Sequence, residues 1–363
     1  MNLARYIVWL TFVPALLVGS MAAQDGHELP PAPSGASQQP VTQPASPASR
    51  PATGPPVTEA ERAILSGDIR KETAPEQRKQ DVVEQGGTTI RVPVNEVSVV
   101  FTVTDKHNRY VKTLKRTDFK VVDDERPVEE IRSFRRETDL PLQVGLLIDA
   151  SNSIRDRFKF EQESAVEFLN QIIRPRYDKA FVVGFDVEPE VTQDFTDDVE
   201  ALGQGVRALH PGGGTAMYDA LYYACRDKLL RSAQSSAVRR AIILVSDGDD
   251  NSSHVTREEA IEMALRANVI VYTISTNFPG GGGGDKVLRR IADATGGRAF
   301  EPFQLSQVAD AFAQIQDDLR SQYELSYRPA NFAHDGRYRT IAITAVPKGL
   351  KVRSRTGYYA PAE

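Results

Sequence analysis

Two continuous apolar runs, each followed by an aspartate, constrain the fold of this chain more than any other feature. Residues 143–148 lead into Asp149, and residues 241–246 lead into Asp247. Neither run alternates between apolar and polar residues, which is typical of parallel strands buried on both faces. Helical patterns separate the runs, so we predict an α/β domain with a doubly wound, mostly parallel sheet.

Other segments continue the same alternation of strand and helix. Strands are expected over residues 181–185 and 269–274, and helices over residues 160–173, 199–209, 285–294 and 305–319. A further helix is expected to begin at Thr256, because Glu259 follows it at the spacing of a capping box. Gly280–Gly284 lacks the Lys-Ser/Thr pair of a phosphate-binding loop, so no nucleotide site is predicted there.

Oxygen-bearing side chains follow the predicted strands. Ser151 and Ser153 come at alternate positions after Asp149, and Thr215 follows the glycines at 212–214. In an open α/β sheet the carboxyl ends of the strands meet at one edge, where ligands bind. Two carboxylates and three hydroxyls, with no sulfur or imidazole, favour a hard divalent cation at this edge.

The same residues resemble the metal-ion-dependent adhesion site of von Willebrand factor type A (VWA) domains. Asp-x-Ser-x-Ser, a threonine in a glycine-rich loop and a later Asp-Gly occur here in the order of that site. The resemblance covers about residues 140–322, and Asp118-Phe119 and residues 356–359 are similar to the flanks of bacterial secreted VWA-related proteins. It implies five metal ligands: Asp149, Ser151, Ser153, Thr215 and Asp247.

The resemblance also implies how the metal is used. An acidic side chain of a protein partner would complete the coordination of the cation. Mg²⁺ is the predicted metal, because it suits an octahedral oxygen set that keeps waters; Ca²⁺ and Mn²⁺ are the alternatives. Gly214, Asp186, Asp249 and Asp250 lie near the set in sequence and could support it. The three extra acids are either solvated, or they make the site more anionic and favour Ca²⁺.

A purely structural role for these residues is the main alternative to a metal site. Asp149, Ser151, Ser153 and Thr215 could cap the helices that follow them, and Asp247-Gly248 could form an ordinary turn. All of these roles would have to coincide in the order of a metal site, so the metal interpretation is preferred.

The N-terminal part of the chain predicts export. Arg5 precedes an apolar stretch at 6–19, and Ser20 and Ala22 are small residues where signal peptidase cleaves. We predict a signal peptide over residues 1–23 and a secreted, periplasmic or envelope protein, with an uncleaved anchor as the alternative. Residues 24–87 are rich in proline and contain no aromatic residue, so we predict a disordered linker.

The two flanks of the α/β region have the composition of β-strands. Residues 88–138 include β-branched stretches at 90–94 and 97–104 and a predicted hairpin over 119–131, while residues 323–363 include three strand-like stretches at 323–327, 338–346 and 350–353. Neither flank has enough strands to bury a sheet face alone. We therefore predict one small β-sandwich formed by both flanks, with the VWA domain, residues 139–322, inserted between them. The charged run at 132–137 is expected to be solvated.

Composition argues against several other classes of protein. The net charge is −5, with no basic cluster that would predict nucleic-acid binding. The single cysteine, Cys225, has helical spacing with Met217 and Leu221, which predicts a buried and inert thiol. The sequence has no Gly-x-Ser-x-Gly or His-Glu-x-x-His motif, and His210 and His254 are expected in exposed loops.

The sequence therefore predicts an exported, non-enzymatic protein-binding module that acts in adhesion or assembly. Its partner would be a protein that presents an acidic side chain to the metal. Two alternatives remain open. One is a metal-dependent hydrolase of the cell envelope, and the other is a structural envelope protein with a vestigial site.

Overall fold

The computed structural model describes residues 96–136, 140–152, 158–231, 238–277, 282–331 and 333–362. The predicted signal peptide, the linker, the stretch at 90–94 and Ser153 lie outside these residues. The described residues belong to one compact unit, Gly87–Glu363.

A six-stranded sheet forms the centre of the α/β region, with strand order β10-β9-β8-β5-β6-β7. Its strands are β10 (Ala299–Phe300), β9 (Val269–Ser275), β8 (Arg239–Ser246), β5 (Leu142–Asp149), β6 (Lys179–Phe185) and β7 (Pro189–Thr196). All neighbours are parallel except β7, which pairs antiparallel with β6 at the edge. The two apolar runs are the central strands β5 and β8, and both are almost completely buried, as predicted.

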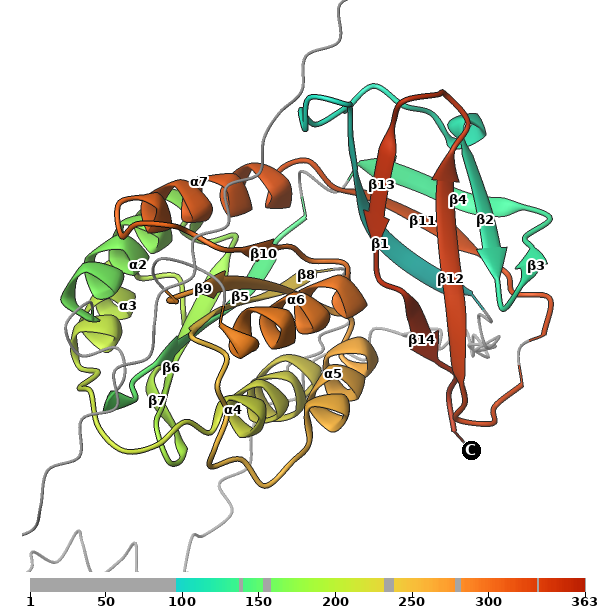
Figure 1. Cartoon of the computed structure of the whole chain (residues 1–363). Helices are drawn as coiled ribbons and strands as arrows, with labels where there is room; N and C mark the ends of the chain where they lie inside the picture. Colours follow the sequence, from blue (N-terminus) through green and yellow to red (C-terminus); the bar gives the residue numbers. More distant parts are fainter. Residues whose placement is uncertain are drawn as a thin grey trace, which may run out of the picture. The chain divides into compact units, whose positions relative to one another are not determined.

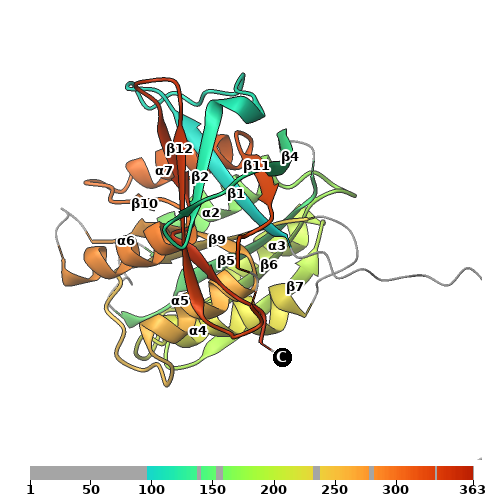
Figure 2. The same ribbon diagram turned by 90° about the vertical axis from the view of Figure 1, so that its right-hand side faces the viewer.

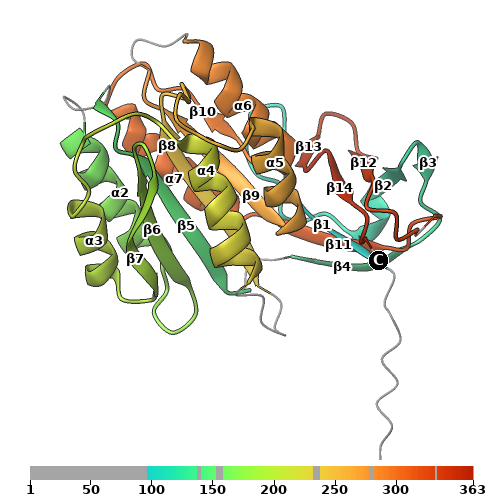
Figure 3. The ribbon, with the colours of Figure 1, turned by 90° about the horizontal axis from the view of Figure 1, so that it is seen from below.

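Helices cover both faces of this sheet (Figures 1 and 3). One face is covered by α2 (Phe158–Ile172), α3 (Val199–Arg207) and α7 (Gln307–Leu319). The other is covered by α4 (Met217–Tyr223), the π-helical segment η4 (Ala224–Leu230), α5 (Arg257–Arg266) and α6 (Gly283–Thr295). The structure confirms a doubly wound α/β fold, because apolar side chains from both faces of the sheet are buried under helices.

Local signals in the sequence explain where some of these elements begin and what they bury. At the start of α5, Thr256 Oγ1 accepts from the Glu259 backbone N–H at 3.3 Å, and the Glu259 carboxylate accepts from the Thr256 N–H at 2.8 Å. This is the predicted capping box. Cys225 is fully buried on the α4–η4 side, and burial raises the pKa of its thiol. The buried position of the thiol is as expected, and burial disfavours the reactive thiolate.

The two flanks form a β-sandwich of two four-stranded sheets (Figure 2). One sheet has the order β13-β1-β11-β4, with β13 (Lys351–Ser354), β1 (Val97–Thr104), β11 (Tyr323–Tyr327) and β4 (Ile131–Arg136). The other has the order β14-β12-β2-β3, with β14 (Gly357–Tyr359), β12 (Tyr338–Ala345), β2 (Phe119–Asp123) and β3 (Arg126–Pro127). Each sheet combines strands from both flanks, so the predicted shared sandwich is confirmed.

Aromatic side chains fill the sandwich core. Phe101 lies edge-on to Phe119 with ring centroids 5.0 Å apart, and it stacks on Tyr323 at 5.6 Å. Tyr327 from β11 donates its hydroxyl to Asp123 Oδ2 at 2.6 Å. Because Asp123 belongs to β2, this buried hydrogen bond joins the two sheets as well as the two flanks.

The N-terminal flank differs from the sequence prediction in two ways. The return strand of the expected hairpin is β3, which has only two residues, Arg126–Pro127. The charged run is solvated over its described residues, as predicted, but it also forms β4, an edge strand paired with β11 that was not predicted. Its arginines are exposed, and the Arg135 Nε–H donates to Glu324 at 2.6 Å. An edge strand with a solvated face can carry such charges. Because β4 lacks a run of apolar residues, the hydrophobic pattern of the sequence did not predict it as a strand.

The last strands of the chain join the sandwich to the α/β region. The Thr356 N–H donates to the Ala294 carbonyl at 3.1 Å, and the Arg353 guanidinium donates to the Gly296 carbonyl at 3.1 Å and to the Asp318 carboxylate. Gly296 ends α6 with φ of 83°, and a Cβ there would lie 2.5 Å from the Arg355 backbone nitrogen. Glycine is required at this contact because it tolerates both the positive φ and the close approach.

Candidate metal centre

The carboxyl ends of β5 and β8 bring the two predicted aspartate ligands to neighbouring positions. The strands are parallel partners, with Ile148 opposite Val245. Asp149 is the last residue of β5, and Asp247 directly follows β8. Both side chains are buried: Asp149 is 0% exposed and Asp247 is 8% exposed.

Asp149 is held in a polar shell provided by its own turn and by β8. Its Oδ2 accepts from the Ser246 hydroxyl at 2.6 Å, and its Oδ1 accepts from the Ser151 backbone N–H at 2.9 Å. Burial raises the pKa of Asp149 to about 6, the hydrogen bonds from Ser246 and Ser151 oppose this shift, and the charge of nearby Asp247 adds to it. A carboxylate in this setting is stabilised by a cation placed beside it.

The glycine loop brings Thr215 to the same edge. Thr215 is buried, and its backbone N–H donates to Asn251 Oδ1 at 2.9 Å. Its carbonyl accepts from the backbone N–H groups of Asn251 and Ser252 at 3.0 and 3.1 Å. Gly214 permits this contact, since a Cβ there would lie 2.3 Å from Ser252 Oγ. The Thr215 loop is thus fixed to the loop that follows Asp247.

The structural alternative for Thr215 receives no support from the geometry of α4. Ala216 precedes α4, and no side-chain hydrogen bond caps this helix at that position. Asp250 takes part of this role instead, because its Oδ2 accepts from the Tyr218 backbone N–H at 2.9 Å. Asp250 also accepts from the Ser253 hydroxyl at 2.6 Å, so its oxygens serve the loop and the start of α4.

The remaining predicted residues lie in different environments. Ser151 is buried next to Asp149, whereas Ser153 lies outside the described residues. Asp186 is half-buried beside the glycine loop, and its carbonyl accepts from the Ala216 N–H at 2.6 Å. Asp249 is exposed, and its backbone N–H donates to Asp247 Oδ1 at 3.1 Å.

Sequence reasoning missed three residues that support this edge. Ser246 bonds to Asp149, Asn251 bonds to Thr215, and Asn277 Nδ2 donates to the Asp247 carbonyl at 2.8 Å and to Asp285 at 2.9 Å. Ser246 could have been found, because it is a polar residue at the end of an otherwise apolar buried strand. Asn251 and Asn277 gave no such signal, since asparagine is common in loops.

The donor set fits a hard divalent cation. The described part of the chain contains no group of three or more His, Cys, Asp or Glu side chains able to hold a metal. The candidate set therefore depends on hydroxyl oxygens in addition to two carboxylates. Oxygen ligands of this kind suit Mg²⁺ and Ca²⁺ better than metals that favour sulfur or imidazole.

The two histidines near this edge are exposed, as predicted. His254 Nδ1 lies 2.9 Å from Asp219 Oδ2, and the hydrogen bond with Asp219 raises the pKa of His254. Asp219 also accepts from the backbone N–H groups of His254 and Val255 at 2.9 Å each. The Asp219 carboxylate therefore fixes the turn before α5, and the hydrogen bonds of the His254 ring and backbone with Asp219 belong to this turn.

Comparison with known families agrees with the fold of the α/β region. Residues 143–317 match the family model of the von Willebrand factor type A domain. The chain is a VWA-domain protein. The matched stretch begins at the second residue of β5 and ends within α7, so it covers the central sheet except for Leu142. The VWA assignment therefore confirms the family predicted from the order of Asp149, Thr215 and Asp247.

Two curated relatives share part of this VWA protein. Calcium-activated chloride channel regulator 1 of Bos taurus is 30% identical over 182 residues, covering 47% of this chain and 19% of the relative. Minor fimbrium subunit Mfa5 of Porphyromonas gingivalis is 32% identical over 150 residues, covering 39% of this chain and 11% of the relative. The chain thus spans less than a fifth of the length of either relative.

A solved structure of proximal thread matrix protein 1 from the mussel byssus, with a zinc-occupied MIDAS motif, is 17% identical with a TM-score of 0.45. The match covers 54% of this chain and 49% of that one. In the VWA protein itself, none of the described helices combines the length and apolar character needed to cross a membrane.

Proposed function

We propose that this VWA protein is an exported, non-enzymatic protein-binding module that acts in adhesion or assembly. Its binding site would be a divalent cation held by Asp149, Ser151, Ser153, Thr215 and Asp247. The observation that carries the proposal is the convergence of two buried aspartates and the tethered Thr215 loop at the carboxyl edge of the sheet.

The cation would supply an exposed positive charge that a carboxylate of a protein partner can approach. Asp149 and Asp247 would balance its charge, and the hydroxyls of Ser151, Ser153 and Thr215 would add neutral oxygen donors. Mg²⁺ suits this set because it keeps several waters, one of which an incoming carboxylate can replace. Ser246 and Asn251 would hold the ligands in place through the hydrogen bonds described above.

Export and spacing complete the proposal. Residues 1–23 would direct the chain out of the cytoplasm, and residues 24–87 would act as an extended linker ahead of the folded unit. The sandwich halves, residues 88–138 and 323–363, would carry the VWA domain, residues 139–322. The resemblance to a fimbrium subunit supports an adhesion or assembly role, although it covers only part of that relative.

Calorimetry with Mg²⁺ tests the metal site directly. Wild-type protein should bind one Mg²⁺, and Asp149→Ala should abolish binding because it removes a charged ligand. Asp249→Asn is the matched control: Asp249 lies two residues after Asp247 but is exposed and outside the ligand set. Equal Mg²⁺ binding by wild-type protein and Asp149→Ala would exclude the proposed site.

Capture of envelope proteins in Mg²⁺ and in EDTA extends the test from metal to partner. A partner should be retained in Mg²⁺ by wild-type protein and by Asp249→Asn, and lost in EDTA or with Asp149→Ala. The hydrolase alternative makes a different prediction, namely metal-dependent turnover of ester, phosphate or peptide substrates. Such turnover, if lost in Asp149→Ala, would replace the binding proposal with an enzymatic one.

A further inference from the structure

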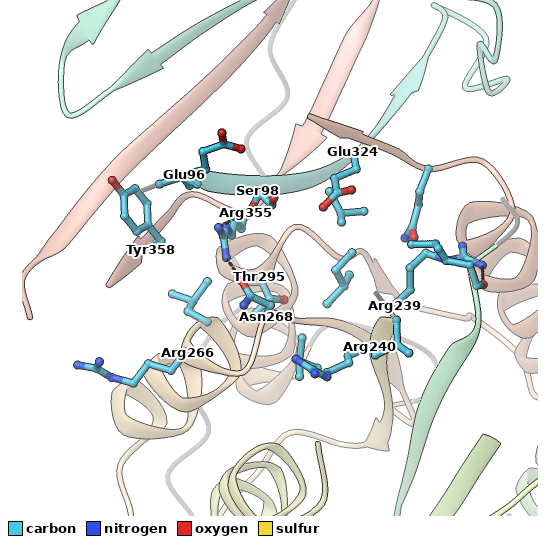
Figure 4. A pocket seen from close by; sticks show the side chains of 18 of the residues that line it. Glu96, Ser98, Arg239, Arg240, Arg266, Asn268, Thr295, Glu324, Arg355 and Tyr358 are labelled. Atoms are coloured by element: carbon cyan, nitrogen blue, oxygen red, sulfur yellow. Dashed lines mark hydrogen bonds between the residues drawn. The ribbon is translucent and has the colours of Figure 1, made fainter. Parts of the chain in front are cut away.

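A cavity of about 480 Å³ lies between the α/β region and the sandwich (Figure 4). Its α/β wall includes the first residues of β8 and β9, among them Arg240 and Val269. The cavity is therefore at the edge where the parallel strands begin, opposite the edge that carries Asp149 and Asp247. Its volume is within the range of small-molecule sites in proteins.

Two arginines enter this cavity from different parts of the fold. Arg240 belongs to β8, and Arg355 belongs to the sandwich segment between β13 and β14 (Figure 4). Arg240 Nη1 donates to the Ala267 carbonyl at 3.0 Å. Arg355 donates to Asn268 Oδ1 at 2.5 Å and to the Ser98 carbonyl at 2.8 Å. All of these acceptors are neutral, so none of them balances the guanidinium charge.

Each of these arginines also keeps a hydrogen-bond donor unused. The Nε atoms of Arg240 and Arg355 are buried, and within the described part of the chain neither has a hydrogen-bond partner. A buried donor without an acceptor, like a buried charge without a counter-charge, costs free energy. Burial lowers the pKa of both guanidinium groups, because removal from water disfavours their charged form.

The other charged groups on the cavity wall already have partners. Glu324 accepts from Arg135 at 2.6 Å, and Glu96 lies 3.6 Å from Arg132. Arg266 pairs with Glu262 at 2.7 Å on α5. The acidic side chains of the wall are thus directed to other arginines, which leaves a positive charge excess around Arg240 and Arg355.

The remaining wall of the cavity is part polar and part apolar. Val100, Leu265, Ile270 and the ring of Tyr358 contribute to its walls. We propose that this cavity is a binding site for a small organic anion, with a carboxylate or phosphate group held by Arg240 and Arg355 and an apolar body against these walls. Two guanidinium groups from different sides can each offer paired N–H donors to such an anion.

The site is independent of the proposed metal function. Ligand binding should therefore be unchanged by EDTA and by Asp149→Ala, because the cavity lies at the opposite edge of the sheet. Failure of one proposal leaves the other standing, since each depends on different residues and a different probe.

Calorimetry or saturation-transfer NMR on the whole chain tests the proposal with hexanoate, phenyl phosphate and hexanol. At least one anion should bind, and comparison of the two anions identifies the preferred head group. Hexanol has a similar apolar body without a charge and should bind at least tenfold more weakly. Arg240→Gln should weaken anion binding by roughly tenfold or more, the usual effect of losing a charged hydrogen bond.

Arg266→Gln is the matched control, because Arg266 lines the same cavity but is paired with Glu262. It should leave anion binding within about twofold of wild type, well below a tenfold step. Wild-type binding should also weaken as sodium chloride is raised, since salt screens the attraction; this measurement needs no variant to fold. The proposal is overturned if neither anion binds, if hexanol binds equally, if binding ignores salt, or if folded Arg240→Gln binds like wild type.

Discussion

At the scale of single residues, the environment of Asp149 is the most informative. Its carboxylate is completely buried and accepts hydrogen bonds from Ser246 and Ser151, yet burial still raises its pKa to about 6. The hydrogen bonds therefore offset only part of the cost of removing the charge from water. The protein therefore retains an ionisable group at a place where its charge is unfavourable without a nearby cation.

This environment predicts a specific pH dependence for the metal-free protein. The pKa of Asp149 in the folded state, about 6, is above the unfolded value of about 4. Between these pH values the folded state binds more protons, so the contribution of Asp149 to stability falls as the pH rises. Urea unfolding in EDTA from pH 4 to 7, values that span this interval, should show this fall in wild-type protein.

The control for this prediction is Asp149→Asn, which removes the ionisation and keeps the side-chain shape. Subtracting its unfolding free energies removes the contributions of other carboxylates, several of which have lowered pKa values and oppose the trend. Equal pH slopes for the two proteins would contradict the prediction. Mg²⁺ affinity should fall as the pH drops below about 6, because the proton and the metal compete for Asp149.

At the scale of helices and strands, hydrophobic pattern predicted those elements that are buried on both faces. The apolar runs at β5, β8 and β9 are short and do not alternate with polar residues, which is typical of strands buried on both faces. The strands missed by the sequence, β4, β7, β10 and β14, are polar or short. Backbone hydrogen bonds to an adjacent strand stabilise them, and the identity of that adjacent strand cannot be deduced from a single sequence.

The same distinction applies to the candidate metal centre. Its proposed ligands could be named from residue type and order, because each follows a predicted strand or a glycine loop. Their supporting partners could not, since Asn251 reaches Thr215 from 36 residues away and Ser246 reaches Asp149 from 97 residues away. Which loop lies beside which is determined by the folded sheet rather than by local sequence.

We predict that Asp318, at the C-terminal end of α7, and Arg353, on β13, are energetically coupled. Asp318, whose side chain is 0% exposed, pairs with Arg353, whose side chain is 21% exposed. Asp318→Asn or Arg353→Met should each reduce the free energy of unfolding by about 3–5 kcal/mol, because either change leaves a buried partner uncompensated. The double variant should lose clearly less than the sum, and urea unfolding of all four proteins would measure the coupling.

A surface pair provides the comparison for this cycle. Arg257 and Glu258 are adjacent on α5, and Glu258 is largely exposed. Removing this pair should change the free energy of unfolding by less than about 1 kcal/mol. Strict additivity of the Asp318 and Arg353 variants would show that the contact contributes no coupling.

At the scale of the whole molecule, the chain depends on strands from both ends of its folded unit. β11 lies between β1 and β4, and β12 lies beside β2. A chain that stops after Gln322 would lose β11, so β1 and β4 would have no common neighbour. The apolar side chains of β1, including Val99 and Phe101, would then be exposed.

We therefore expect truncation after Gln322 to make residues 96–136 sensitive to protease, while the helices and central sheet remain protected. Limited proteolysis followed by mass spectrometry would locate the cleavage sites. Truncation after Tyr359 is the control, because it removes the last few residues but keeps all the described strands. Full protection of residues 96–136 in the chain that ends at Gln322 would contradict a shared sandwich.

The β4–β11 pair has one more consequence. Arg136 and Tyr323 are direct partners across these antiparallel strands, so the chain leaves the sandwich and returns to it at neighbouring backbone positions. The two points at which the α/β region is connected to the sandwich are therefore adjacent in space, as an inserted domain requires. Any domain with closely spaced termini could be exchanged at this place without moving a strand of the host. Different domains could therefore have been inserted into the same sandwich at a single point in its gene.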